Sequence, residues 1–176
     1  MKLFEKEDMK MIEPKSITIE NLEDLTFIYI RFRGSYAAFR KQSRKMFNEL
    51  FEFATKNELI IQDETKVLTI YDDNPFITDA KNLRTSVAMT IPNDRPLQEI
   101  QETGNICLSS ISGKFGVGHF ELSAKEYGDA WQYMYQEWLF KDERKVRDAV
   151  PFELYVTEPP RNSKEKSLTD IYIPIN

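Results

Sequence analysis

The stretch that decides the fold lies near the C-terminus and reads Pro151-Phe152-Glu153-Leu154-Tyr155-Val156-Thr157-Glu158-Pro159. Its aromatic and aliphatic residues favour a short strand, which ends in a proline-marked turn. Because side chains alternate along a strand, Glu153 and Tyr155 share one face and their apolar neighbours share the other. Strands disfavour glutamate. Glu153 is therefore either an ordinary solvent-facing residue or an acid placed where its charge matters.

The same ending occurs in the first half of the chain. Residues 71–75 read Tyr-Asp-Asp-Asn-Pro and correspond to residues 155–159. Each half reads as strand, strand, helix, strand, strand, which defines repeat 1 (about 15–92) and repeat 2 (about 104–176), separated by a polar connector. Two such units predict an α+β domain with pseudo-twofold symmetry, in which one antiparallel sheet packs against two long helices. A groove between related halves is a natural ligand site, so we expect a ligand cleft there.

Within repeat 1, alternating residues predict strands at 16–20 and 27–33, which we interpret as a hairpin. The periodicity then predicts a helix from Tyr36 to about Lys56, with Ser35 as its N-terminal cap. Two further strands follow, at 66–71 and 83–91.

Repeat 2 follows the same plan, with strands at 106–111 and 115–122 joined by a tight turn. Ser123 and Glu126 fit a capping box for a helix that runs to about Phe140. One face of that helix carries large residues at helical spacing, among them Trp131 and Trp138, which suit a core or the edge of a groove. The strand at 152–156 comes next, and a last strand is expected at 169–175.

Composition limits the function classes. The chain has 176 residues, a formal net charge of −5 and a pI near 5.1, which argue against general binding to nucleic acid or anionic membranes. Its single cysteine excludes an internal disulfide. Residues 1–14 form a charged arm without a signal-peptide core, and no stretch is long enough to cross a bilayer. We expect a cytoplasmic protein.

Other potentially reactive residues favour structural interpretations. His119 is the lone histidine, so a zinc site is not expected, and neither is a cofactor. Adjacent Asp72 and Asp73 are interpreted as turn formers, because neighbouring strand residues point apart. The glycines of 113–118 lack the Gly-Lys-Ser/Thr ending of a phosphate-binding loop, and the serines of 109–112 lack a nucleophile elbow.

Several motifs in order resemble the gyrase-inhibitor-like family, which is also the effector-binding domain of AraC-type and MerR-type multidrug regulators. They are 27–34 before a helix, 71–75, 84–88, the helix with Trp131 and Trp138, 152–155 and 171–175. The resemblance covers residues 15–176 and implies a single domain of two strand-strand-helix-strand-strand units. It also implies an aromatic cleft between the halves.

The resemblance implies specific site residues. The buried glutamate of the family maps onto Glu153, and a pocket tyrosine of the last strand maps onto Tyr172. Tyr71, Tyr155 and Trp131 complete the expected ligand-binding set. A carboxylate among aromatic rings gains from a delocalised cation, so the implied ligands are hydrophobic small molecules, cationic ones in particular.

An alternative stays open. Some stand-alone relatives hydrolyse reactive cyclopropane-type electrophiles, which would give Glu153, Tyr172 and Trp131 catalytic roles. Regulators of this family carry a helix-turn-helix segment, for which residues 1–14 are too short. We therefore expect a stand-alone member or an isolated effector domain, with a small-molecule ligand and no direct nucleic-acid or membrane binding. A protein partner is left open, since no residue pattern identifies one.

Overall fold

Six strands, two α-helices, a short 3-10 helix and a π-helix make up the computed structural model, which describes residues 12–94 and 104–176. Most of the charged arm and of the polar connector lies outside the described residues. The order of the elements is β1 (Ser16–Arg33), α1 (Tyr36–Lys56), β2 (Val67–Tyr71), η2 (Ala80–Asn82), β3 (Arg84–Thr90), β4 (Cys107–Leu122), α2 (Tyr127–Tyr133), η4 (Met134–Phe140), β5 (Phe152–Tyr155) and β6 (Ser167–Pro174). The class is α+β, as the sequence predicts.

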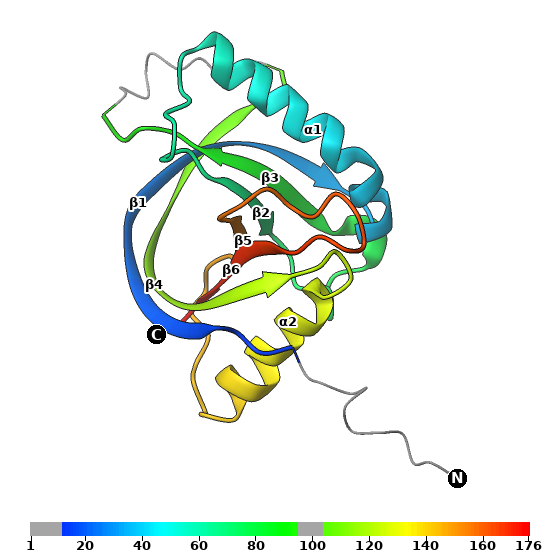
Figure 1. The fold of residues 1–176 in the computed structure, drawn as a ribbon, viewed down its shortest axis with the longest axis vertical. Coiled ribbons are helices and arrows are strands. Elements are labelled where there is room, and N and C mark those ends of the chain that lie inside the picture. The colour runs from blue at the N-terminus through cyan, green and yellow to red at the C-terminus, as the bar shows by residue number, and fades with distance from the viewer. Residues whose placement is uncertain (1–11, 95–103) are drawn as a thin grey trace.

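The strands form one antiparallel sheet that closes on itself in the order β1-β3-β2-β5-β6-β4. Closure comes from the long strand β1, which pairs with β3 on one side and with β4 on the other. Repeat 1 supplies three adjacent strands and repeat 2 the other three. The two sets meet twice, where β2 pairs with β5 and where β1 pairs with β4. The helices lie outside the barrel, α1 along β1 and β3 and α2 beside β4 (Figure 1).

Closure divides the apolar residues into three clusters. The cluster inside the barrel takes residues from all six strands and none from a helix, for example Ile70, Phe115 and Phe152. On the outer faces of the strands, apolar side chains pack against α1 to form a second cluster. Others pack against α2 and η4 to form a third. Alternation therefore decides whether a strand residue faces the barrel interior or the surface between the helices.

The prediction of two β-hairpins is wrong. Residues 16–33 form a single strand, and so do residues 107–122, because the two strands pair with each other along most of their length. The polar residues that the sequence indicates as turns lie at a bend shared by β1 and β4, where the register of the pair shifts between Leu22 and Leu25. Ser112 donates to Asp24 Oδ1 at 2.8 Å, which joins the two bends. Gly113 adopts a φ of 108° there, a conformation that favours glycine.

The prediction of two long helical stretches is confirmed. Helix α1 spans Tyr36–Lys56, and the Ser35 hydroxyl accepts the backbone N–H of Ala38 at 3.1 Å. Glu126 accepts the backbone N–H of Ser123 at 2.9 Å, as the capping box predicts. Helix α2 begins only at Tyr127, however, so the prediction that Ser123 is its N-terminal cap is wrong. The second helix ends at Phe140 but changes from α to π geometry at Met134. Among the described residues, no helix is long and apolar enough to span a membrane.

Candidate functional site

Glu153 lies on the outer face of β5 and is almost completely buried, with 3% of its surface exposed. Three side chains donate hydrogen bonds to its carboxylate. Tyr71 Oη and Trp131 Nε1 donate to Oε1 at 2.9 and 2.7 Å, and Tyr155 Oη donates to Oε2 at 2.8 Å. We call these four residues the Glu153 cluster. The carboxylate is solvated by protein donors in place of water.

The Glu153 cluster joins elements from both repeats. Tyr71 comes from β2, Trp131 from α2, and Glu153 and Tyr155 come from β5. The rings of Tyr71 and Trp131 meet edge to face, with centroids 5.3 Å apart. The cluster therefore spans the junction of the two halves, where the repeat pattern predicts a site.

Two further tyrosines extend the aromatic surface. Tyr36, the first residue of α1, meets the Tyr71 ring edge to face at 5.8 Å. Tyr135 of η4 stacks on Trp131 at 6.1 Å. Sequence reasoning missed both, although Tyr135 lies one helical turn beyond Trp131 and so shares its helix face. With them, rings from both helical stretches adjoin the Glu153 cluster.

Among the described residues, the carboxylate of Glu153 has no cationic partner. Within residues 12–94 and 104–176, no lysine or arginine forms an ion pair with it. Burial raises the pKa of Glu153 above its ordinary value of 4.5, and the hydrogen bonds from Trp131, Tyr155 and Tyr71 act in the opposite direction. Burial, followed by the charge of Glu153, raises the pKa of Tyr71 and of Tyr155 well above 10. The tyrosines therefore stay protonated and remain donors at neutral pH.

Tyr172 lies away from the other expected site residues. Its ring faces the barrel interior and stacks on Phe152 with centroids 4.4 Å apart. Its hydroxyl donates to Glu20 Oε2 at 3.1 Å. The β5–β6 register pairs Tyr172 with Phe152, whereas Glu153 pairs with Ile171, so the sheet separates Tyr172 from the Glu153 cluster.

His119 takes part in a hydrogen-bonded chain that links three strands. Its Nδ1 lies 2.8 Å from Asp170 Oδ1, and its Nε2 lies 2.8 Å from Thr18 Oγ1. No group of three or more potential metal ligands occurs in the part of the chain that the structure describes. These contacts tie β1 and β6 to β4.

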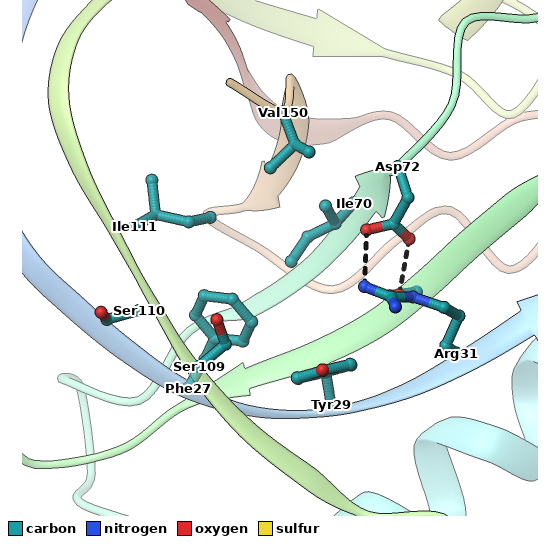
Figure 2. Close-up of a pocket in the computed structure, with 10 residues that line it drawn as sticks. Phe27, Tyr29, Arg31, Ile70, Asp72, Ser109, Ser110, Ile111 and Val150 are labelled. Atoms are coloured by element: carbon teal, nitrogen blue, oxygen red, sulfur yellow. Dashed lines mark hydrogen bonds and ion pairs between the residues drawn. The ribbon is translucent and has the colours of Figure 1, made fainter. Parts of the chain in front are cut away.

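A cavity of about 150 Å³ lies on the inner side of β2, across the strand from Tyr71. Figure 2 shows Ile70 and Asp72, the neighbours of Tyr71 in the chain, beside Arg31 and several apolar side chains. The cavity is therefore distinct from the Glu153 cluster.

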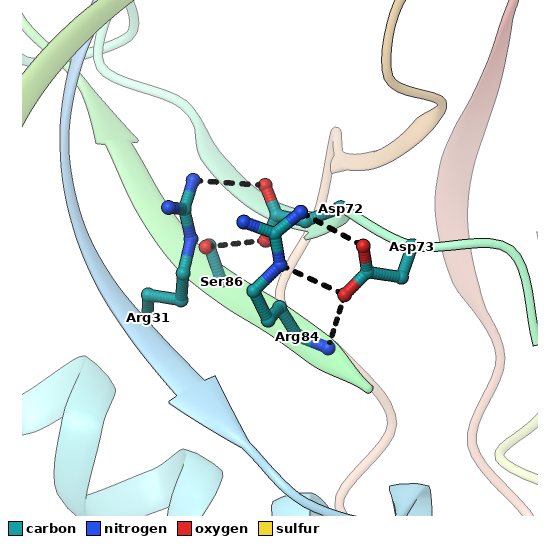
Figure 3. Close-up of polar contacts among 5 residues, drawn as sticks. All are labelled: Arg31, Asp72, Asp73, Arg84 and Ser86. Atoms are coloured by element: carbon teal, nitrogen blue, oxygen red, sulfur yellow. Dashed lines mark hydrogen bonds and ion pairs between the residues drawn. The ribbon is translucent and has the colours of Figure 1, made fainter. Parts of the chain in front are cut away.

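Ion pairs anchor the chain directly after Tyr71 (Figure 3). Arg31 Nη2 lies 3.2 Å from Asp72 Oδ1, and the Ser86 hydroxyl donates to Asp72 Oδ2 at 2.7 Å. Arg84 donates to Asp73 through its backbone N–H, Nε and Nη2, at 2.8–2.9 Å. Asp72 and Asp73 do follow the strand, but each also fixes the end of β2 through an arginine, which the sequence did not reveal.

Comparison with known proteins identifies the fold. The family model described as the GyrI-like small molecule binding domain matches residues 15–176. No curated protein matches the sequence significantly. Among solved structures, the C-terminal domain of EcmrR is 16% identical, with 92% of this chain and 97% of that chain covered and a TM-score of 0.69. In the EcmrR–DNA complex, the chain spans 57% of the EcmrR chain.

Two other solved structures have the same fold. SAV2435 bound to tetraphenylphosphonium is 14% identical, covers 92% of this chain and 94% of its own, and has a TM-score of 0.58. A hydrolase encoded by lin2189 from Listeria innocua is 9% identical, covers 98% of this chain and 97% of its own, and has a TM-score of 0.59. At these identities the similarity concerns the fold.

Proposed function

Because the chain belongs to the family of GyrI-like small molecule binding domains, we propose that it binds hydrophobic cations at the Glu153 cluster, for sensing or sequestration. The observation that carries this proposal is the burial of the Glu153 carboxylate without a cationic partner in the described part of the chain. A buried charge is costly unless it is paired. A bound cation would supply the missing partner.

The rings around Glu153 suit a cation whose charge is delocalised. Tyr36, Tyr71, Trp131 and Tyr135 form a contiguous aromatic surface. Aromatic faces attract cations, most strongly where both are shielded from water. Such a surface selects for charge and flat apolar groups rather than for one chemical structure. The structure of SAV2435 with tetraphenylphosphonium supports this class of ligand, since the two folds are similar.

Ligand entry requires the rings to move. Glu153 is 3% exposed, and its oxygens are already occupied by Tyr71, Trp131 and Tyr155. A cation that reaches the carboxylate must displace at least one of these donors or pass between their rings. We therefore expect binding to change the fluorescence of Trp131, whose indole N–H contacts the carboxylate.

The test is calorimetric titration with tetraphenylphosphonium. We expect Glu153→Gln to weaken binding by at least about tenfold, which corresponds to about 1.4 kcal/mol. Glu20→Gln is the matched control, because Glu20 also accepts a tyrosine hydroxyl but lies near Tyr172, across the sheet from Glu153. Tetraphenylborate, the anion of similar size, is expected to bind more weakly than the cation. Equal cation affinity in the wild type and in Glu153→Gln would refute the proposal.

A second candidate function is hydrolysis at the same site. It is favoured by the raised pKa of the Glu153 carboxyl and by the adjacent phenols, which suit a general base with groups that hold a substrate. The hydrolase from Listeria innocua, which has a similar fold, supports testing it. This function requires turnover of a cyclopropane-bearing electrophile with uptake of water, and loss of turnover in Glu153→Gln. Binding of such an electrophile without turnover would contradict hydrolysis and support the binding function.

A further inference from the structure

The cavity on the inner side of β2 combines an apolar wall with a charged rim (Figure 2). Its apolar wall comes from Phe27, Ile70, Ile111 and Val150. Three of these side chains are buried, and Val150 is half-buried. Arg31 and Asp72 line the cavity beside them. A molecule in this space would meet an apolar surface at one end and hydrogen-bonding groups at the other.

The charged rim is internally neutralised. Arg31 Nη2 contacts Asp72 Oδ1, and the Ser86 hydroxyl occupies Asp72 Oδ2. Both oxygens of Asp72 are therefore engaged, and the carboxylate offers little to a ligand. The guanidinium has five N–H donors, and only Nη2 forms a hydrogen bond within the described residues. Since 42% of the Arg31 side chain is exposed, its other donors can reach a ligand.

The volume fits a single aromatic ring. A cavity of about 150 Å³ lined by leucine, isoleucine and phenylalanine is large enough to hold benzene. This cavity has a similar volume, and it opens beside Ser109 and Ser110, which are exposed. A ring could occupy the apolar part while a small polar substituent remains beside Arg31.

We propose that this cavity is a second ligand site, which takes small neutral aromatic molecules that carry a carbonyl acceptor, such as aromatic amides. The ring packs against Ile70, Ile111 and Val150, and the carbonyl oxygen accepts a hydrogen bond from Arg31. A neutral ligand is preferred because the Arg31–Asp72 pair leaves no unbalanced charge. An ionic ligand would lose hydration, and its attraction to one member of the pair would be offset by repulsion from the other. The site thus differs from the Glu153 cluster, whose carboxylate has no cationic partner in the described part of the chain.

The test uses three ligands of nearly identical shape and different charge, namely benzamide, benzoate and benzamidinium. Titrations of the whole chain are followed by amide chemical shifts. We expect benzamide to bind most tightly, by at least about fivefold over each ion. The largest shifts should occur at residues 27–31, 70–72 and 109–111. Tightest binding by benzoate or benzamidinium, or shifts confined to other residues, would overturn the proposal.

Two variants sharpen the test. Val150→Phe fills the apolar part from a half-buried position and should weaken benzamide binding by at least about tenfold. Arg31→Met leaves Asp72 unpaired, so the preference should change from benzamide to benzamidinium. A Val150→Phe protein with an unchanged fold and unchanged benzamide affinity would also overturn the proposal. Glu153→Gln should leave benzamide binding unaltered, which separates this site from the Glu153 cluster.

Discussion

Thr69 and Glu153 lie directly opposite each other where β2 pairs with β5. They occupy corresponding positions in the two repeats, because each precedes by two residues the tyrosine of its repeat. The two tyrosines reach across this junction in opposite directions. Tyr71 donates to Glu153, and Tyr155 lies 2.6 Å from Thr69 Oγ1 while it donates to Glu153 Oε2. One acid on a nearly symmetric frame therefore receives donors from both halves.

The two tyrosines differ in what their removal leaves behind. Tyr155 is the one donor to Oε2 in the described residues, whereas Oε1 keeps Trp131 if Tyr71 is lost. We therefore expect Tyr155→Phe to lower the free energy of unfolding by about 1–3 kcal/mol, and Tyr71→Phe by less. Urea denaturation at neutral pH measures both. The reverse order of the two losses would contradict the assignment of donors to the two oxygens.

The stability of the protein should depend on the ionisation of Glu153. Burial raises its pKa above 4.5 in the folded state, so the folded protein holds the proton to higher pH than the unfolded chain does. The free energy of unfolding should fall as the pH rises from about 4.5 to the folded-state pKa, by about 1.4 kcal/mol for each unit between the two pKa values. Glu153→Gln should lack this decline. If the difference in the free energy of unfolding between the wild type and Glu153→Gln does not vary with pH, the raised pKa of Glu153 is contradicted.

Local sequence patterns, namely capping residues and helical periodicity, predicted the positions of the helices. Ser35 caps α1 as expected, and both helices end where their periodicity ends. Glu126 accepts the backbone N–H of Ser123 as expected, although α2 begins only at Tyr127. These contacts join residues three positions apart, so the sequence contains nearly all the information that determines them.

Long-range pairing was not predictable in the same way. The polar residues 21–24 and 112–114 have the composition of hairpin turns, yet they lie opposite each other at a bend shared by β1 and β4. Turn-forming residues serve equally well at a bulge or a corner of a barrel. Only the pairing partner distinguishes these cases, and it lies about ninety residues away in the sequence.

The candidate site was partly predictable for the same reason. Alternation, the repeat and the helix face drew attention to Glu153, Tyr155, Tyr71 and Trp131, and the family resemblance assigned them to one site. Tyr172 was expected beside them, but the register of β6 sets it opposite Phe152 and inside the barrel. Shifting the register of a strand by one residue moves every side chain to the other face, and the sequence of β6 alone does not fix that register.

The Asp73–Arg84 pair should stabilise the end of β2 in a pH-dependent manner. Hydrogen bonds from the Arg84 side chain, above all, hold the pKa of Asp73 below 3.8. The stabilisation is therefore present at pH values above about 3.8 and lost as the pH falls through the lower folded-state pKa. We expect Asp73→Asn to lower stability at neutral pH and to reduce the loss on acidification. Arg84→Lys keeps the charge but not the two-pronged contact, and should recover only part of the stability. Denaturation at neutral and acidic pH measures both; full stability in Asp73→Asn would contradict the pair's role.

Gly116 on β4 allows Trp138 of η4 to pack directly against the barrel. A Cβ added at Gly116 would collide with the Trp138 ring, and that ring is nearly buried. We therefore expect Gly116→Ala to lower the free energy of unfolding by about 1–3 kcal/mol, because the second helix must shift. Gly128 in α2 is the matched control, since nothing lies within 4 Å of its added Cβ. Gly128→Ala should raise stability by about 0.5–1 kcal/mol. Chemical denaturation measures both variants. Equal effects of the two substitutions on the free energy of unfolding would contradict the need for glycine at position 116 beside Trp138.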